Sequence, residues 1–148
     1  MADAGTKIDL ERAREIAGAV ADPEIPVLTL ADLGVIRDVK TDGGSLVVDI
    51  SPTYIGCPAV LAIELAVEAA LRDGGFEHVR ISRVLSPAWS TDDITAAGRE
   101  KLRDYGIAPP LRRSGKAALL FEDDTVACPH CGSTATHKIA EFGSTACK

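Results

Sequence analysis

Hydrophobic residues recur at helical spacing near the start of the chain, over residues 8–20. The intervening positions are mostly charged, and the residues that share the apolar face are Ala13, Ile16, Ala17 and Val20. This pattern predicts an amphipathic helix that packs its apolar face on a core. We expect the helix to end before Asp22-Pro23, because a residue that precedes proline is disfavoured in the helical region.

Two runs of alternating apolar and polar residues follow, at residues 35–40 and 46–50, with a glycine-containing turn at residues 41–44. Alternation with a period of two is typical of strands with one buried face, and such a turn joins antiparallel strands. Residues 58–72 are apolar on almost every side and predict a buried helix. Residues 78–85 predict a third strand, which would complete a right-handed strand–helix–strand crossover.

A third helix is predicted after residue 90, where Ser90 and Asp93 resemble a capping box and Gly106 provides the end. The chain's single tryptophan, Trp89, precedes this helix. Two interpretations of Trp89 stay open. It is either a packing residue at the edge of the core or an anchor for a partner protein.

Together these elements predict an α+β fold, a small three-stranded mixed sheet packed with helices, over residues 1–110. Residues 112–116 form a short basic connector, where we expect a domain boundary. The second part, residues 111–148, then contains the connector and a tail that carries three of the four cysteines.

The fourth cysteine, Cys57, lies between the second strand and the long helix in the sequence Gly56-Cys57-Pro58. Proline is favoured at the first helical position, so we expect Cys57 at or near the N-cap. The helix dipole and unpaired N–H groups there favour the thiolate, which is the form that binds metals. Cys57 is therefore either a reactive or metal-binding thiol or a small buried hydrophobic residue.

The segment Asp22-Pro23-Glu24-Ile25-Pro26 contains two prolines and two carboxylates. Its two fixed φ angles predict a stiff, extended segment. Asp22 either caps a neighbouring backbone group in a rigid loop or contributes, with Glu24, to a functional site.

Charge and cysteine usage narrow the function classes. A formal net charge of −6 argues against binding to nucleic acids or anionic membranes, since both require a basic face. The N-terminus lacks the pattern of a secretory signal, and Glu64 and Glu68 interrupt the longest apolar segment, so we expect a cytoplasmic protein. In a reducing compartment, four cysteines favour metal or thiol chemistry over disulfides.

The tail contains Cys128-Pro129-His130-Cys131-Gly132, which is half of a zinc-ribbon knuckle. Cys147 offers a third sulfur for zinc, and His130 or His137 could supply a nitrogen. The alternatives are a disordered tail with spare thiols and a redox-active dithiol. We find no set of nucleophile, base and orienting residue, and no phosphate-binding glycine loop, so a non-catalytic protein is favoured over an enzyme.

Three short motifs, in this order along the chain, resemble those of the metal–sulfur cluster assembly family. They are the acidic segment at residues 22–26, Asp32-Leu33-Gly34, and Thr53 followed by Gly56-Cys57-Pro58. Residues 86–92, 105–110, 128–133 and 141–148 further resemble its D-subunit branch, from aerobic phenylacetyl-CoA epoxidase systems. The resemblance implies the small iron–sulfur cluster assembly fold followed by a zinc-ribbon-like tail. In the family a second Cys-x-x-Cys completes that tail, and this sequence lacks it.

The resemblance also implies an auxiliary subunit of phenylacetate catabolism that assembles or delivers an iron or iron–sulfur centre. The family's site residues correspond to Cys57, Asp22, Glu24 and Thr53, and its zinc knuckle to Cys128 and Cys131. Cys147 is the candidate for a third metal ligand. The implied cofactors are a structural zinc and a transiently held iron or cluster. The implied partners are oxygenase or reductase subunits, with a homodimer as a further assembly. The rival interpretations are a structural adaptor of the oxygenase and a general cytosolic cluster assembly factor.

Overall fold

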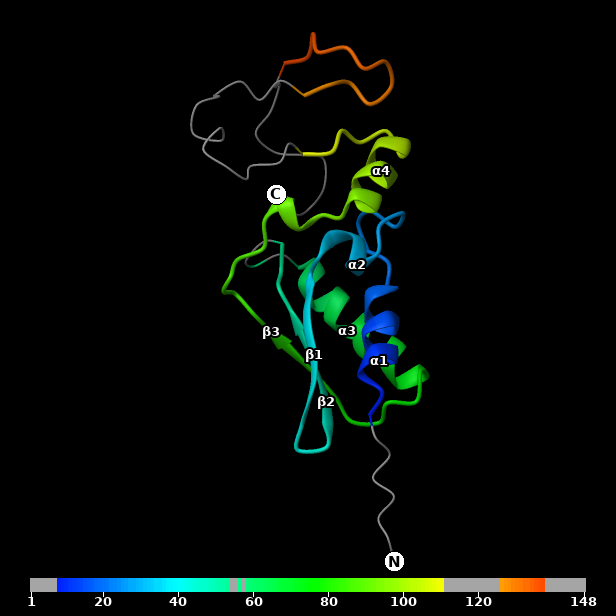
Figure 1. Ribbon diagram of the computed structural model, residues 1–148, viewed down its shortest axis with the longest axis vertical. Helices are drawn as coiled ribbons and strands as arrows, with labels where there is room; N and C mark the ends of the chain where they lie inside the picture. Colours follow the sequence, from blue (N-terminus) through cyan, green and yellow to red (C-terminus); the bar gives the residue numbers. More distant parts are fainter. Residues whose placement is uncertain (1–7, 54–55, 57, 111–125, 138–148) are drawn as a thin grey trace, which may run out of the picture.

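The computed structural model describes residues 8–53, 56, 58–110 and 126–137 (Figure 1). The elements in chain order are α1 (Leu10–Gly18), α2 (Leu30–Leu33), β1 (Ile36–Asp42), β2 (Ser45–Ile50), α3 (Ala59–Asp73), β3 (Val79–Arg83), the 3₁₀ helix η1 (Thr91–Asp93) and α4 (Ala96–Asp104). None of the helices in these described ranges has the length and apolar character needed to cross a membrane.

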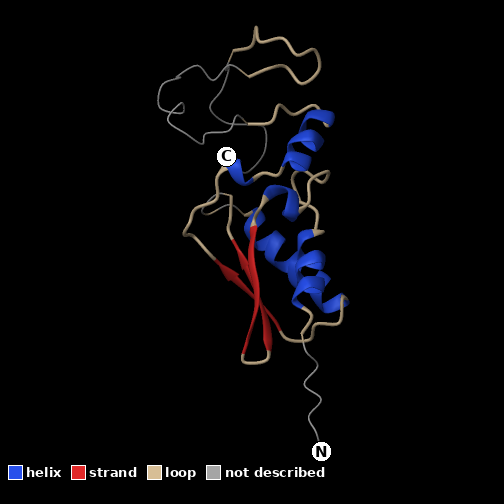
Figure 2. Ribbon diagram, viewed as in Figure 1, coloured by secondary structure: helices blue, strands red, loops and turns tan. Residues whose placement is uncertain are grey.

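The strands form one three-stranded sheet in the order β1-β2-β3 (Figure 2). β1 and β2 are antiparallel, with Val39 opposite Val48, and β2 and β3 are parallel, with Val48 opposite Ile81. The predicted hairpin, the crossover through α3 and the mixed sheet are therefore confirmed. Parallel neighbours require such a crossover, because a tight turn can join only antiparallel strands.

α1 and α3 pack side by side on the same face of the sheet (Figure 1). The sheet contributes alternate residues to the core, including Val39, Val48 and Ile50, and each of them is at least 96% buried. The helices contribute the fully buried Ala17 and Leu71. Removing a buried leucine side chain of this kind typically costs about 2–5 kcal/mol, so this layer supplies much of the stability.

A second layer of contacts closes the end of the sheet where β2 and β3 finish. Asp32 completes a capping box with Thr29 at the start of α2, and its backbone oxygen accepts a hydrogen bond from the N–H of Thr95. Gly34 has φ of +69°, and a Cβ there would lie 2.4 Å from the backbone oxygen of Asp93. Glycine is needed at residue 34 for both reasons, which explains the Asp32-Leu33-Gly34 motif as a structural junction.

Trp89 packs partly buried against the core, and its Nε1 donates a 2.7 Å hydrogen bond to the backbone oxygen of Leu33. Both the apolar ring and the polar N–H have partners within the chain. Of the two interpretations, this geometry favours the packing residue.

Two local predictions were wrong, and α2 was missed because a four-residue helix is too short to show a hydrophobic period. Residues 22–26 were expected to be extended, but the chain turns there: Leu28 N–H bonds to the oxygen of Ile25, and Asp22 N–H bonds to that of Leu28. α3 begins at Ala59, and Pro58 occupies the cap position rather than the first helical position.

Candidate functional site

Two segments meet at the end of the sheet where β2 stops: residues 22–28, and residues 51–53 directly after β2. Between them lies a cavity of about 40 Å³. It is lined by Asp22, Glu24, Val35, Ile50, Ser51, Pro52, Thr53, Ala59, Val60 and Ile63. The cavity therefore has an apolar floor from the core and a polar rim from the two segments.

The acidic loop is held in shape by its own carboxylate. Oδ1 of Asp22 accepts hydrogen bonds from the backbone N–H groups of Glu24, at 2.9 Å, and Ile25, at 2.7 Å. Fully buried Leu28 and an isolated bridge between Ala21 and Thr29 anchor the loop to the domain. One oxygen of Asp22 thus shapes the loop, and Glu24 is presented to solvent.

The first turn of α3 forms the opposite wall through Ala59 and Val60. Pro58 occupies the N-cap position, and its side chain makes no hydrogen bond to the backbone N–H groups of the first turn. Such a helix end carries a partial positive charge equivalent to about +0.5. Gly56 precedes the helix with φ of +84°, a conformation in which glycine is strongly favoured.

Three of the four residues implied for iron or cluster handling, Asp22, Glu24 and Thr53, line this one cavity. They come from segments about thirty residues apart in the sequence, so their meeting is a product of the fold. The fourth, Cys57, lies outside the described residues. The functional role of this set stays a prediction.

Ser51 is a lining residue that sequence reasoning did not single out. It is 1% exposed, and within the described part of the chain its Oγ has no hydrogen-bond partner. One hint of this burial was present in the sequence, because Ser51 directly follows the apolar strand that ends at Ile50. A polar residue at the end of a strand is nevertheless usually expected to contact water, so its burial was not predicted.

The Cys128 knuckle forms a separate site beyond α4. The N–H of Gly132 bonds to the oxygen of Cys128 at 2.8 Å, which closes the turn. Backbone N–H groups of Cys131 and His130, together with the Cys131 side chain, lower the pKa of the Cys128 thiol. Lowering this pKa favours the thiolate that zinc requires, so the pair fits half of a zinc site. Cys147 lies outside the described residues.

The knuckle also contacts the preceding domain. A Cβ at Gly106 would lie 3.2 Å from Cε1 of His130, so the imidazole packs closely against the turn after α4. Within the described ranges, no three residues among His, Cys, Asp and Glu form a group that could hold a metal ion.

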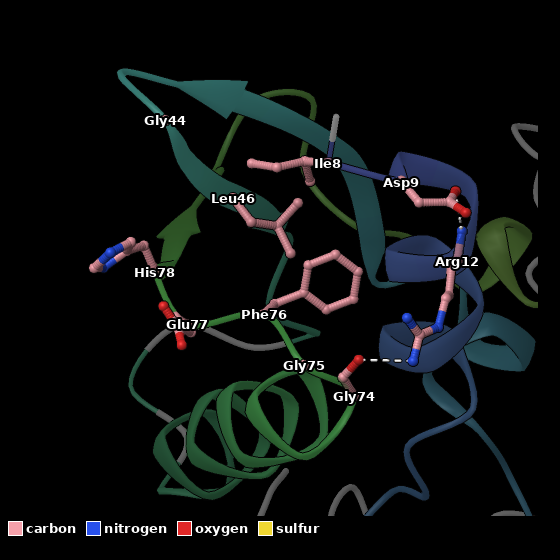
Figure 3. Close-up of a pocket in the computed structure, with 10 residues that line it drawn as sticks. All are labelled: Ile8, Asp9, Arg12, Gly44, Leu46, Gly74, Gly75, Phe76, Glu77 and His78. Atoms are coloured by element: carbon pink, nitrogen blue, oxygen red, sulfur yellow. Dashed lines mark hydrogen bonds between the residues drawn. The ribbon is translucent and has the colours of Figure 1, made fainter. Parts of the chain in front are cut away.

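A larger cavity of about 490 Å³ lies at the opposite end of the sheet (Figure 3). Figure 3 shows the Phe76 ring between Leu46 and Arg12, whereas His78 points away from them. Arg12 donates to the oxygen of Gly74 at 2.7 Å and lies over Phe76, and Asp9 caps α1. These polar groups serve the fold, and none of the predicted site residues lines this cavity, so we place the candidate site at the smaller one.

Comparison with known proteins gives matches to both parts of the chain. The iron-sulfur cluster assembly protein family matches residues 12–82, and the PaaD zinc beta ribbon domain matches residues 112–148. The putative 1,2-phenylacetyl-CoA epoxidase D subunit of Escherichia coli (strain K12) is 48% identical over 129 residues, which is 87% of this chain and 76% of that protein. The chain belongs to this D-subunit family.

Solved structures agree with this assignment of the fold. A domain of unknown function, DUF59, from Bacillus anthracis is 25% identical with a TM-score of 0.58, over 63% of this chain and 90% of that one. The conserved hypothetical protein TM0487 from Thermotoga maritima is 24% identical with a TM-score of 0.54, over 65% and 95%. The predicted fold class, a three-stranded mixed sheet with helices followed by a zinc-ribbon-type tail, is confirmed.

Proposed function

We propose that this chain is an accessory subunit of a phenylacetyl-CoA epoxidase system that assembles or delivers an iron or iron–sulfur centre. The client would be an oxygenase or reductase subunit of that system. The proposal is supported by 48% identity to the D subunit from Escherichia coli. It is also supported by the match of residues 12–82 to the iron-sulfur cluster assembly protein family.

The observation that carries the proposal is the meeting of Asp22, Glu24 and Thr53 around one cavity beside the first turn of α3. Cys57 is one residue before Pro58, which caps that helix. In the proposed role the Cys57 thiolate binds iron or a cluster transiently, since thiolates are soft ligands that suit iron–sulfur chemistry. The carboxylates of Asp22 and Glu24 would add hard oxygen ligands or contact the client protein.

The knuckle has a structural role in this proposal. Cys128 and Cys131 would hold zinc with further ligands, among them Cys147, and keep the tail in a defined shape. The 3.2 Å approach between a Cβ at Gly106 and Cε1 of His130 supports a contact between the knuckle and the turn after α4. No step of iron handling is assigned to the zinc.

The test is the iron content of the client. The epoxidase oxygenase and reductase would be purified from cells that express either the unchanged chain or Cys57→Ser, with Cys131→Ser as the matched cysteine control. We expect clients from Cys57→Ser cells to lack iron while their protein level is unchanged. Normal iron in the clients, together with unchanged activity, would favour a structural adaptor and contradict iron delivery.

A further inference from the structure

β3 is the edge strand of the sheet (Figure 2). On the side toward β2, the backbone oxygen of His78 accepts the N–H of Leu46 at 2.8 Å. In a parallel pair every second residue of a strand bonds to the same neighbour, so the even-numbered residues of β3 bond to β2. The N–H and C=O groups of the odd-numbered residues then point away from the sheet. In the part of the chain that the structure describes, these groups have no partner on Val79, Ile81 and Arg83.

α3 exposes an apolar face beside this free edge. Leu61 and Leu65 are each 57% exposed, and the neighbouring solvent-facing positions carry alanine. Residues three or four apart lie on one side of a helix, so Leu61 has Glu64 and Leu65 as neighbours on the helix surface. Glu64 points to β3, because its Oε2 accepts a 2.9 Å hydrogen bond from Nη2 of Arg83. The two exposed leucines therefore lie on the side of α3 that borders the free edge.

The charged residues of β3 do not block pairing with another strand. Natural edge strands often carry charges that oppose the approach of a second strand. Both arginines of β3 are already paired within the chain, however: Nη2 of Arg80 lies 2.6 Å from Oδ2 of Asp42, and Arg83 bonds to Glu64. The edge therefore carries little uncompensated charge, whereas its free backbone groups and the exposed apolar face of α3 favour contact with another chain.

The sequence of β3 fits a second copy of itself. A twofold axis through Ile81 places two β3 strands antiparallel and pairs all five residues of the strand. The free backbone groups of Val79 then face those of Arg83 in the second copy, and Ile81 faces Ile81. Arg80 lies opposite Ser82, so no arginine lies opposite another arginine. Like charges directly opposite each other are destabilising, so this register is favoured over one with its axis through Arg80.

Pairing through β3 alone would bury too little surface for a stable dimer. An isolated pair of short strands is marginal in water, and specific interfaces bury about 800 Å² on each partner. In the continuous sheet that this pairing forms, both copies of α3 lie on the same face, one on each side of the twofold axis. Packed helices are about 8–10 Å apart, so Leu61 and Leu65 of each copy become covered.

We propose that two copies of this chain associate through β3, edge to edge and antiparallel, and that Leu61 and Leu65 of α3 complete the interface. This interaction surface goes beyond the proposed function and does not depend on it. A second copy is the occupant that the residues favour, because the register needs no property of the second strand other than those of β3 itself.

Sedimentation equilibrium of the full chain, in reductant and chelator, measures the dissociation constant without disulfides or shared metal ions between copies. We expect a dimer whose fraction rises with concentration. Ser82→Arg places an arginine opposite Arg80 twice in each dimer and should weaken association by about 10-fold, whereas Ser82→Glu places a carboxylate there and should strengthen it by about 3-fold. Thr41→Arg, on the opposite edge strand β1, is the matched control and should leave association unchanged.

A second variant tests the helix face and does not alter the sheet. Leu65→Gln should weaken association by about 10-fold, because the leucine loses its burial in both copies. Tyr105→Gln removes an equally exposed residue directly after α4 and should not change association. Thermal unfolding at concentrations where the chain is monomeric should give similar midpoints for both variants and the unchanged chain, because both side chains are exposed in the single chain.

Hydrogen exchange gives a direct view of the edge. The amides of Val79, Ile81 and Arg83 have no partner in the single chain, so they should become protected only at concentrations at which the dimer forms. This measurement uses the unchanged chain and tests the pairing even if a Ser82 variant folds poorly.

A chain that stays monomeric at every concentration would overturn the proposal. So would a dimer with the same dissociation constant in Ser82→Arg and Ser82→Glu, or β3 amides that exchange equally fast in monomer and dimer. A monomeric chain that binds an oxygenase or reductase subunit, with that binding lost in Ser82→Arg, would assign the edge to a client strand and overturn the pairing of two copies. None of these outcomes bears on the iron content of the client, which tests the proposed function separately.

Discussion

Nζ of Lys101 on α4 lies 2.6 Å from Oδ2 of Asp32 on α2, and this ion pair joins two helices whose residues are 69 positions apart. The same carboxylate oxygen accepts the backbone N–H of Thr29 at 3.0 Å. Burial alone would raise the pKa of Asp32, but the hydrogen bonds from Lys101 and Thr29 outweigh it and lower that pKa. Asp32 thus holds together the end of the molecule that carries the candidate site.

Replacement of Asp32 by alanine should destabilise the domain. The change removes the capping box of α2 and leaves Lys101 without its partner, so we expect a loss of about 1–3 kcal/mol in the free energy of unfolding. Urea denaturation measures it. Asp104→Ala, at an exposed position at the end of α4, is the control and should change stability by no more than about 0.5 kcal/mol. Equal effects of the two substitutions would show that the Asp32 contacts contribute nothing.

Stability should fall in acid because several carboxyl groups have lowered pKa values. Arg83 lowers the pKa of Glu64 through its hydrogen bonds, one of them 2.9 Å long, and the N–H of Ser90 together with Arg37 lowers that of Asp93. These groups bind protons more weakly in the folded than in the unfolded chain. Their stabilisation is therefore complete above the unfolded values, near about 4, and is lost as the pH falls through the folded values.

Unfolding free energy measured between about pH 7 and pH 2 checks this expectation. Glu64→Gln removes one of the titrating groups, so its stability should decline less steeply below about pH 4 than that of the unchanged chain. Parallel curves for the two proteins would contradict the assignment to Glu64.

The regular elements could be predicted because their signals are local. The apolar positions of α1, the alternation in β1 and β2, and the length of the apolar run in α3 each fix an element within a residue or two. The crossover from β2 through α3 to β3 then leaves few arrangements of the sheet. Family motifs pointed correctly to the fold class.

The remaining features depend on contacts that no local pattern records. Residues 22–28 fold into turns because Asp22 accepts hydrogen bonds from the N–H groups of Glu24 and Ile25, whereas two prolines alone suggested an extended segment. Ser51 became notable only when the cavity around it was known, since a strand pattern does not reveal an unpaired hydroxyl. The contact between His130 and Gly106 likewise joins parts whose sequence patterns are unrelated.

Residues 1–113 should fold without the tail. All the helices and strands that the structure describes end by Asp104, and the knuckle's contact at Gly106 involves only the surface after α4. A chain shortened after Arg113 should keep a cooperative thermal transition and the fluorescence of partly buried Trp89. A broad transition without cooperativity would show that the tail is part of the core.

The knuckle should bind zinc weakly in the 148-residue sequence, which contains one Cys-x-x-Cys pair, and tightly in a chain extended by a second such pair. A complete site in zinc-finger peptides contributes roughly 10–16 kcal/mol of apparent binding free energy, and a site that lacks sulfurs should lose a large part of it. Metal analysis of the two chains measures the difference. Tight stoichiometric zinc in the present chain would contradict the expectation and would require Cys147 with His130 or His137, or a second chain, to complete the site.

The most direct test of iron handling at the end of β2 is reconstitution of the isolated chain with iron(II) and sulfide without oxygen. Bound iron and sulfide would be measured after gel filtration for the unchanged chain, Cys57→Ser and Cys131→Ser. We predict stoichiometric iron in the unchanged chain and in Cys131→Ser, and little or none stably bound after sulfide treatment in Cys57→Ser. Equal iron in all three proteins, or iron lost only in Cys131→Ser, would contradict the claim that this site handles iron.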